Sequence, residues 1–244
     1  MTRGSGPDLV LLPGWGLPPA VFDPWRPWLQ GTRTLHPLEL PFNGHEMSAT
    51  DALDAVVRRL LRVAPPCARW VGWSLGGMIA LAVAAAAPAR VEELILIAAT
   101  PRFTRVADWP HALDAAELQQ FRDSLSNSVP QTLRRFAALC ARGCADTVAL
   151  GRELNAACRD VAFPPPAALQ SGLDMLAELD LRVVLRQVPQ RLRLILGDSD
   201  PLVPATVIPD LRQLRPDIEI LHLESAGHTP FLSHKQVCAD FVRA

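Results

Sequence analysis

Ser74 is the residue best placed to do covalent chemistry, because it stands at the centre of the pentapeptide Gly-Trp-Ser-Leu-Gly at residues 72–76. This G-x-S-x-G pattern follows a strand-like segment at residues 69–72 and precedes an alanine-rich, helix-like run. In a nucleophile elbow the serine occupies a tight strand-to-helix turn, and its hydroxyl projects above the sheet. Flanking glycines allow the close backbone approach that this turn needs. Ser74 is a candidate nucleophile, although the same pattern also occurs in ordinary strand-to-helix connections.

A serine hydroxyl needs a base to accept its proton, and the chain has six histidines. His228 lies in the glycine-containing loop of residues 225–231, after a strand-like segment at residues 218–223, and from there it can reach across the top of a sheet. His222 lies within that strand and His234 within the last expected helix, so both are expected to be packing or surface residues. The other three lie in segments where we identify no acid-base arrangement, and one of them, His111, is expected near the mouth of the site; they are His36, His45 and His111. His228 is therefore the expected base.

An acidic residue must orient the histidine, and after a G-x-S-x-G elbow the chain order is serine, acid, histidine. A strand-like segment at residues 192–196 ends in Gly-Asp-Ser-Asp-Pro. Asp200 is preferred because it follows the strand by a few residues, where its carboxylate can turn toward His228, and Pro201 stiffens the loop after it. Asp198 is the alternative acid.

Backbone N–H groups are expected to stabilise the negative charge of the tetrahedral intermediate. One donor is the amide of Leu75, which directly follows the nucleophile at the start of its helix. The second is the amide of Trp15, in the loop of residues 13–17 that follows a strand at residues 8–12. The Trp15 indole can also form a wall of the pocket or belong to the core.

Strand-like and helix-like segments alternate along the chain, and this pattern indicates an α/β fold with a mostly parallel central sheet flanked by helices. Pro88 is expected to end the helix that follows Ser74. The expected strands are residues 9–12, 33–38, 69–72, 93–98, 192–196 and 218–223, and the expected helices are residues 19–30, 49–64, 75–87, 205–214 and 231–244.

The long stretch between residues 98 and 192 contains no convincing strand, and one crossover helix does not need so much chain. We expect a helical lid at about residues 108–185, inserted into one α/β domain that spans residues 1–244. Two apolar stripes with helical spacing support this expectation. They are Leu133, Phe136, Ala137 and Cys140, and Leu169, Leu173 and Leu176.

Composition is consistent with one compact enzyme of 244 residues, 49% of them hydrophobic. A formal net charge of −1 gives no basic footprint for nucleic acid, and no apolar run is long enough to span a bilayer. Residues 1–6 contain no hydrophobic signal segment, so the cytoplasm is expected. The five cysteines predict neither a disulfide framework nor a metal site, because they are odd in number and lack a C-x-x-C pair; they are Cys67, Cys140, Cys144, Cys158 and Cys238.

Four segments together resemble the α/β-hydrolase superfamily: residues 12–16, 72–77, 200–204 and 227–231. More narrowly, the chain is similar to the family of esterases that cleave the methyl ester of pimeloyl-acyl carrier protein in biotin synthesis. The narrower resemblance rests on Gly-Trp-Gly at residues 14–16, Gly-Trp-Ser-Leu-Gly-Gly at 72–77, Asp-Trp-Pro at 108–110 and Phe-Leu-Ser-His at 231–234. One departure is Pro13, which takes the place of the histidine usual before Gly-Trp-Gly.

The resemblance implies a serine esterase whose partner is an acyl carrier protein, and whose chemistry needs no metal or organic cofactor. It implies that Arg135 and Arg152 contact the carrier, since arginine forks suit phosphate and acidic groups, whereas Gln131 and Val148 occupy other contact positions. It also points to an acyl channel in the lid. The expected substrate-binding residues are Trp15, Ser74, Leu75, Phe136, Ala137, Ala138, Leu139, Cys140 and His228.

Three functions are compatible with these motifs. The leading expectation is hydrolysis of the pimeloyl methyl ester by a monomer in which Ser74, His228 and Asp200 form the triad. A broad carboxylesterase for short acyl esters is the nearer alternative. A catalytically silent α/β-hydrolase that serves as a binding module is the more distant one.

Overall fold

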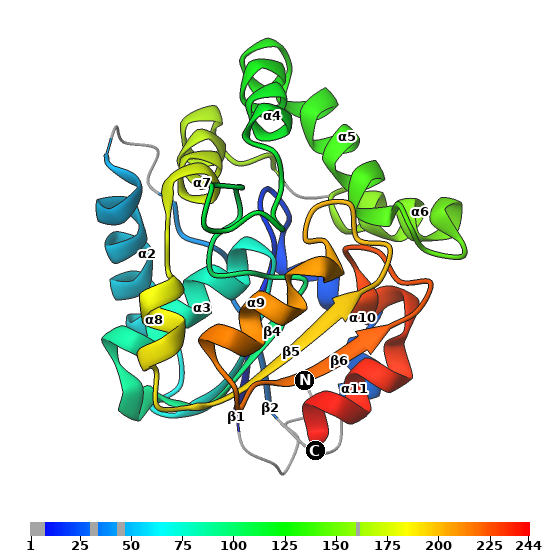
Figure 1. The fold of residues 1–244 in the computed structure, drawn as a ribbon. Helices are drawn as coiled ribbons and strands as arrows, with labels where there is room; N and C mark the ends of the chain where they lie inside the picture. Colours follow the sequence, from blue (N-terminus) through cyan, green and yellow to red (C-terminus); the bar gives the residue numbers. More distant parts are fainter. Residues whose placement is uncertain (1–7, 30–33, 43–46, 160–161) are drawn as a thin grey trace.

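The computed structural model describes residues 8–29, 34–42, 47–159 and 162–244 (Figure 1). Its centre is a sheet of six strands in the order β2-β1-β3-β4-β5-β6, and every pair of neighbours in it is parallel. The strands are β1 (Asp8–Leu12), β2 (Thr34–Pro37), β3 (Ala68–Trp73), β4 (Val91–Ile97), β5 (Arg191–Gly197) and β6 (Glu219–Leu223). The expected α/β fold and all six strand positions are confirmed. Three residues named in the sequence analysis lie outside the described residues: Gln30, Arg33 and His45.

Both faces of the sheet are covered. Successive side chains of a strand point to opposite faces, and the consecutive residues 94–97 of β4 are all buried. Helix α3 (Leu75–Ala86) packs on β3 and β4, and α2 (Ala49–Val63) and α8 (Arg182–Gln187) pack against α3. From the two ends of the chain, α1 (Arg26–Leu29) and α11 (Lys235–Arg243) pack against each other.

Three helices expected to be continuous are interrupted. Residues 19–29 form a 3-10 turn η1 (Pro19–Phe22) and then α1, because Pro24 and Pro27 each lack an N–H and disfavour a continuous helix. Residues 231–244 form α10 (Pro230–Ser233) and α11, separated by His234, whose φ of −126° and ψ of 50° are not helical. Residues 205–214 form η3 (Ala205–Val207) and α9 (Ile208–Leu214).

In the described part of the chain, five helices lie between β4 and β5, and four of them stand together above one end of the sheet (Figure 1). Three of these four helices have an N-cap residue whose side chain accepts a hydrogen bond from a backbone N–H of the first turn. These N-caps are Asp114, Ser128 and Asp146. The fourth begins after the proline run, at Pro166. These helices are α4 (Ala115–Asn127), α5 (Val129–Ala141), α6 (Thr147–Ala157) and α7 (Pro166–Glu178).

The carboxyl ends of parallel strands meet at one edge of a sheet, and the candidate site residues all follow such ends. Trp15 follows β1, Ser74 follows β3, Asp200 follows β5 and His228 follows β6. The inserted helices α4–α7 lie over this edge (Figure 1), so they cover the place where the loops converge.

Candidate active site

Ser74 occupies a strained turn between β3 and α3, with φ of 54° and ψ of −121°. Its N–H donates to the Ile97 carbonyl of the neighbouring strand at 2.9 Å, which fixes the turn to the sheet. A Cβ atom at Gly72 would lie 2.3 Å from the Gly76 carbonyl oxygen, and one at Gly76 would lie 2.5 Å from the Leu12 carbonyl oxygen. The two flanking glycines are therefore required by close backbone contacts, as a nucleophile elbow needs.

Gly76→Ala is expected to destabilise the fold, because its Cβ would overlap a rigid backbone carbonyl after β1. Overpacking of this kind costs typically about 1–3 kcal/mol. Gly151→Ala on α6 is the matched control, since a Cβ there meets no atom within 4 Å. That control should gain roughly 0.5–1 kcal/mol through the lower flexibility of alanine in a helix. Thermal unfolding of both variants measures the difference, and equal stabilities would contradict the packing argument.

The structure brings His228 and Asp200 together in the interior. The Nδ1 atom of His228 lies 2.8 Å from Oδ2 of Asp200 and 3.1 Å from Oδ1, and both side chains are fully buried. Oδ1 also accepts hydrogen bonds from the N–H groups of Leu202, at 2.8 Å, and Val203, at 3.0 Å. Because three donors surround this carboxylate, its orientation toward the imidazole is fixed.

The other nitrogen of His228, Nε2, is buried and has no hydrogen-bond partner among the described residues. Buried polar atoms are normally hydrogen-bonded, because leaving one without a partner is costly. A catalytic role is one explanation for a buried polar atom that has no partner. Trp73, the residue before Ser74, donates its indole N–H to the His228 carbonyl at 2.7 Å. This bond places the histidine loop against the elbow, so the free Nε2 atom is available for the serine hydroxyl or a substrate atom.

The alternative acid and the other histidines lie elsewhere. Asp198 is exposed, and the hydroxyl of Ser199, at 2.9 Å, lowers the pKa of its carboxyl below the ordinary value. His222 is exposed on β6. His36 pairs with Asp8 at 2.5 Å, His111 with Asp210 at 2.7 Å, and His234 contacts Ser233 at 2.9 Å; His45 lies outside the described residues.

The two candidate oxyanion donors also lie at this edge. Leu75 is the first residue of α3, so its N–H has no acceptor within the helix. Trp15 lies in the loop after β1, directly before Gly16, whose φ is +68°. The Trp15 indole donates to the Leu169 carbonyl of α7 at 2.8 Å, and its ring meets the ring of Phe136 edge-on at 5.1 Å. Contacts with the inserted helices thus hold the loop that carries the Trp15 amide.

A small apolar cavity lies beside Ser74, with a volume of about 10 Å³. This is room for roughly one water molecule, so an acyl chain can enter only if the surrounding side chains move. Lining residues from the loops and inserted helices are Trp15, Phe103, Leu113, Leu118, Phe121, Phe136, Leu173, Leu176 and Leu202.

The structure separates the five consecutive residues that were expected to line an acyl channel. Phe136 forms part of the cavity wall, and Ala137 and Cys140 are buried. Ala138 and Leu139 instead line an outer groove of about 330 Å³ between α4 and α5. The reason is the period of the helix, which turns residues 138 and 139 away from the face that carries Phe136.

Two cysteines lie close to the acid and base. Burial raises the pKa of the Cys140 thiol well above its ordinary value, and the nearby Asp200 and Cys144 raise that pKa further. Cys140 therefore stays a neutral thiol and does not compete with Ser74 as a nucleophile. Cys140 lies in the last turn of α5, and Cys144 lies beyond the end of that helix at Ala141.

The two candidate carrier-binding arginines are on the outside of the inserted helices. Arg135 of α5 lies in the outer groove, where it donates to the side-chain oxygen of Gln120 at 3.1 Å and its guanidinium lies 5.3 Å from the centre of the Phe121 ring. Arg142 lines the same groove. Arg152 is exposed on α6, which packs against α5.

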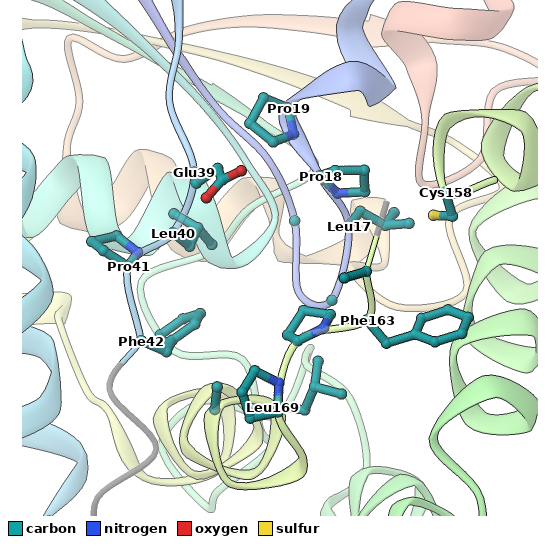
Figure 2. Close-up of a pocket in the computed structure, with 16 residues that line it drawn as sticks. Leu17, Pro18, Pro19, Glu39, Leu40, Pro41, Phe42, Cys158, Phe163 and Leu169 are labelled. Carbon is teal, nitrogen blue, oxygen red and sulfur yellow. The ribbon is translucent and has the colours of Figure 1, made fainter. Parts of the chain in front are cut away.

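A larger cavity, of about 330 Å³, borders the same loop after β1 (Figure 2). Figure 2 shows Leu17 and Pro18 of that loop between Phe42 on one side and Phe163 on the other. Sequence patterns do not indicate this cavity, because its walls come from three separate parts of the chain: residues 14–19, residues 39–42, and Cys158 with residues 162–169. The proline run at residues 164–166, which gives the third segment its shape, is the one local signal.

Within the described part of the chain, no three His, Cys, Asp or Glu side chains are grouped in a way that could hold a metal ion. None of the described helices combines the length and apolar character needed to cross a membrane.

Residues 9–241 match the model of the alpha/beta hydrolase family, and the chain belongs to this family. It is 36% identical over 242 residues to "Pimeloyl-[acyl-carrier protein] methyl ester esterase" of Methylococcus capsulatus, covering 99% of this chain and 95% of that relative. It is 42% identical over 235 residues to the protein of the same name from Xanthomonas oryzae, covering 95% of this chain and 91% of the relative. A solved esterase from Exiguobacterium antarcticum has the same fold, with a TM-score of 0.81 at 20% identity over 98% of this chain and 91% of that one.

Proposed function

We propose that this protein is a serine esterase that hydrolyses the methyl ester of a pimeloyl group carried on acyl carrier protein, as a step of biotin synthesis. The observation that carries the proposal is the buried Asp200–His228 pair, whose Nε2 atom has no partner among the described residues and whose loop is bonded to Trp73, the residue before Ser74. The printed names of the relatives supply the substrate.

The reaction is acyl transfer in two stages. Ser74 attacks the ester carbonyl while Nε2 of His228 accepts the hydroxyl proton, and Asp200 holds Nδ1–H and stabilises the imidazolium. The amides of Trp15 and Leu75 donate to the oxyanion. His228 then gives its proton to the methoxy oxygen, and methanol leaves. Water, deprotonated by His228, attacks the acyl-serine, and collapse of that intermediate returns the proton to Ser74 and releases the acid.

We further propose that residues 108–185 act as a lid over the single domain of residues 1–244. Support comes from the apolar side chains that α4, α5 and α7 contribute to the wall of the closed cavity, among them Phe121, Phe136 and Leu173. Since that cavity has room for about one water molecule, the lid must move to admit an acyl chain.

The carrier is proposed to dock on the outside of this lid, at Arg135 and Arg152. Arginine guanidinium groups bind phosphate and carboxylate oxygens with paired hydrogen bonds, as an acidic carrier with a phosphate-linked arm requires. We also propose that the enzyme acts as a monomer in the cytoplasm. The monomer is supported by the fact that one chain supplies every residue of the proposed site. The cytoplasm is supported by the five cysteines, which are all free thiols, because a reducing compartment keeps thiols reduced.

A broad carboxylesterase for short acyl esters is the second candidate, and the small volume beside Ser74 favours it. Comparing kcat/KM for the carrier-linked pimeloyl methyl ester with kcat/KM for a small soluble ester distinguishes the two. A large preference for the carrier-linked ester, together with restored biotin-free growth of a strain that lacks the esterase, supports the first proposal. Equal values and no restored growth support the second.

Changing both Arg135 and Arg152 to alanine is expected to raise KM for the carrier-linked ester and to leave kcat nearly unchanged. The physical reason is that these guanidinium groups are exposed on the outside of the inserted helices, where they would supply uniform binding. Added salt should weaken the wild-type carrier reaction in the same direction, because exposed charges are screened over about 10 Å at 0.1 M.

A matched control removes two exposed arginines that lie outside residues 108–185, Arg186 at the end of α8 and Arg212 of α9. This control changes the net charge equally and should leave the selectivity for the carrier-linked ester intact. Equal losses on the carrier-linked and the small ester in the Arg135/Arg152 variant would indicate a disturbed lid. An unchanged KM for the carrier-linked ester would exclude these arginines as the docking site.

A further inference from the structure

The segment at the C-terminal end of α5, residues 140–144, is bonded to the histidine loop on both sides of His228. On one side, the Thr229 hydroxyl donates to the Cys140 carbonyl at 3.1 Å. On the other side, the Gly227 N–H donates to the Cys144 sulfur at 3.2 Å. Thr229 and Cys144 are buried, and the residue between these two bonds is His228.

The same segment also contacts the loop that carries Asp200. Gly143 has a φ of +83°, and a Cβ atom there would lie 2.2 Å from the Ser199 carbonyl oxygen. The Ser199 N–H donates to the Ala226 carbonyl at 3.0 Å, so the acid loop and the histidine loop are also bonded to each other. A Cβ atom at Gly227 would lie 2.0 Å from the Arg142 carbonyl oxygen. Residues 140–144 therefore lie against both loops at backbone distance.

These bonds matter for the imidazole because they fix the backbone on either side of His228, in addition to the bond that Trp73 makes to the His228 carbonyl. Asp200 holds one side of the ring, and the Nε2 atom has no partner, so the ring position also depends on the backbone at Gly227 and Thr229. The Cys140 carbonyl is among the last four carbonyls of α5, and these groups receive no hydrogen bond from an N–H within the helix. The Thr229 hydroxyl donates the hydrogen bond that the Cys140 carbonyl would otherwise lack. Because the bonded groups are buried, water cannot replace a lost bond without cost.

We propose that Thr229 and Cys144 are positioning residues, which fasten the catalytic histidine to the end of helix α5. This inference rests on the proposed function only in that the protein must be a hydrolase that uses His228 as its base. The same helix carries Phe136 in the wall of the reacting cavity. One inserted helix thus contacts the acyl pocket and also sets the position of the base that works there.

The test compares Thr229→Val with Thr229→Ser. Valine removes the hydroxyl at similar shape, whereas serine keeps it. The expected result for Thr229→Val is a fall in kcat of roughly 10-fold to 100-fold with KM little changed, because misplacing a catalytic group by about 1 Å can cost about 100-fold. Thr229→Ser should restore most of kcat. Cys144→Ala and Cys144→Ser form a second pair with the same expected order.

Thr132→Val is the matched control. Thr132 is buried on the same helix and donates its hydroxyl to the Ser128 carbonyl at 2.9 Å, far from both catalytic loops in sequence. It should lose stability comparably to Thr229→Val but keep kcat. A further readout is the low-field proton resonance of the Nδ1–H bonded to Asp200, which should shift in Thr229→Val and stay in place in Thr132→Val.

Equal kcat values for Thr229→Val and Thr229→Ser would overturn the proposal, and so would a loss of kcat in Thr132→Val as large as that in Thr229→Val. All variants are assayed on a small soluble ester as well as on the carrier-linked ester. If the wild-type protein hydrolyses only the small ester, the pimeloyl substrate is wrong. The comparison at Thr229 still decides the positioning role in that case, because every ester reaction needs the same base.

Discussion

Ser74→Ala is expected to lower kcat for ester hydrolysis by about 10⁶-fold, the size seen when a nucleophile that acts within a triad is removed. The hydroxyl forms the covalent intermediate, so no neighbouring group can replace it, and burial keeps the Cys140 thiol neutral. Folding should be retained, because alanine is smaller and the turn is held by the backbone bond from Ser74 to Ile97. The measurements are kcat and the thermal unfolding midpoint.

Ser126→Ala is the control for this change, since Ser126 is exposed on α4 and bonds only to a carbonyl of its own helix. It should leave kcat unchanged. A serine-directed phosphonate should label the wild-type protein and Ser126→Ala but not Ser74→Ala. If wild type itself resists the phosphonate, the chain is a silent hydrolase used for binding. If Ser74→Ala keeps substantial activity, another residue is the nucleophile.

Asp200→Asn is expected to lower kcat by about 10⁴-fold, the effect typical of an acid that orients a catalytic histidine. The side-chain oxygen must still accept from the N–H groups of Leu202 and Val203, so the asparagine NH₂ would face Nδ1 of His228. Nδ1 would then have to accept a hydrogen bond, which places the imidazole proton on Nε2 and removes its ability to accept the serine proton.

Asp198→Asn is the matched control, because Asp198 is exposed and bonds to Ser199 rather than to the imidazole. It should change kcat only slightly. The two variants are compared by kcat at a pH where the wild type is fully active, with thermal unfolding as the measure of folding. A larger loss in Asp198→Asn than in Asp200→Asn would show that the acid has been assigned to the wrong carboxylate.

Much of the reaction machinery is readable from local sequence. A nucleophile elbow requires glycines at fixed offsets from the serine, because backbone atoms approach to distances that no Cβ tolerates, and Gly72 and Gly76 meet this requirement. Alternating strands and helices predict a parallel sheet, and a parallel sheet brings the ends of β1, β3, β5 and β6 to one edge. The order of Ser74, Asp200 and His228 along the chain follows from the same topology.

The direction in which each side chain points is harder to predict from local sequence than the position of a helix or strand. Five consecutive residues of one helix were expected in one channel, but a period of 3.6 residues places Phe136 at the cavity and Ala138 and Leu139 on the outer groove. Buried charge is a second example. Glu93 and Arg193 lie in strands that were predicted correctly, yet their burial depends on ion pairs with neighbouring strands and on the Phe241 ring, 3.9 Å from the Arg193 guanidinium.

The class of fold, the elbow and the loops that carry the acid and the base can be predicted from the amino-acid sequence, because they depend on backbone geometry that glycines, prolines and apolar periodicity encode locally. Three features became known from the folded chain: Asp200 rather than Asp198 contacts His228, the cavity beside Ser74 is closed, and residues 140–144 lie against both catalytic loops. Those three features are contacts between segments far apart in the chain. Their distances depend on how the inserted helices pack over the sheet, and apolar periodicity shows which face of a helix is buried but not which distant segment that face meets.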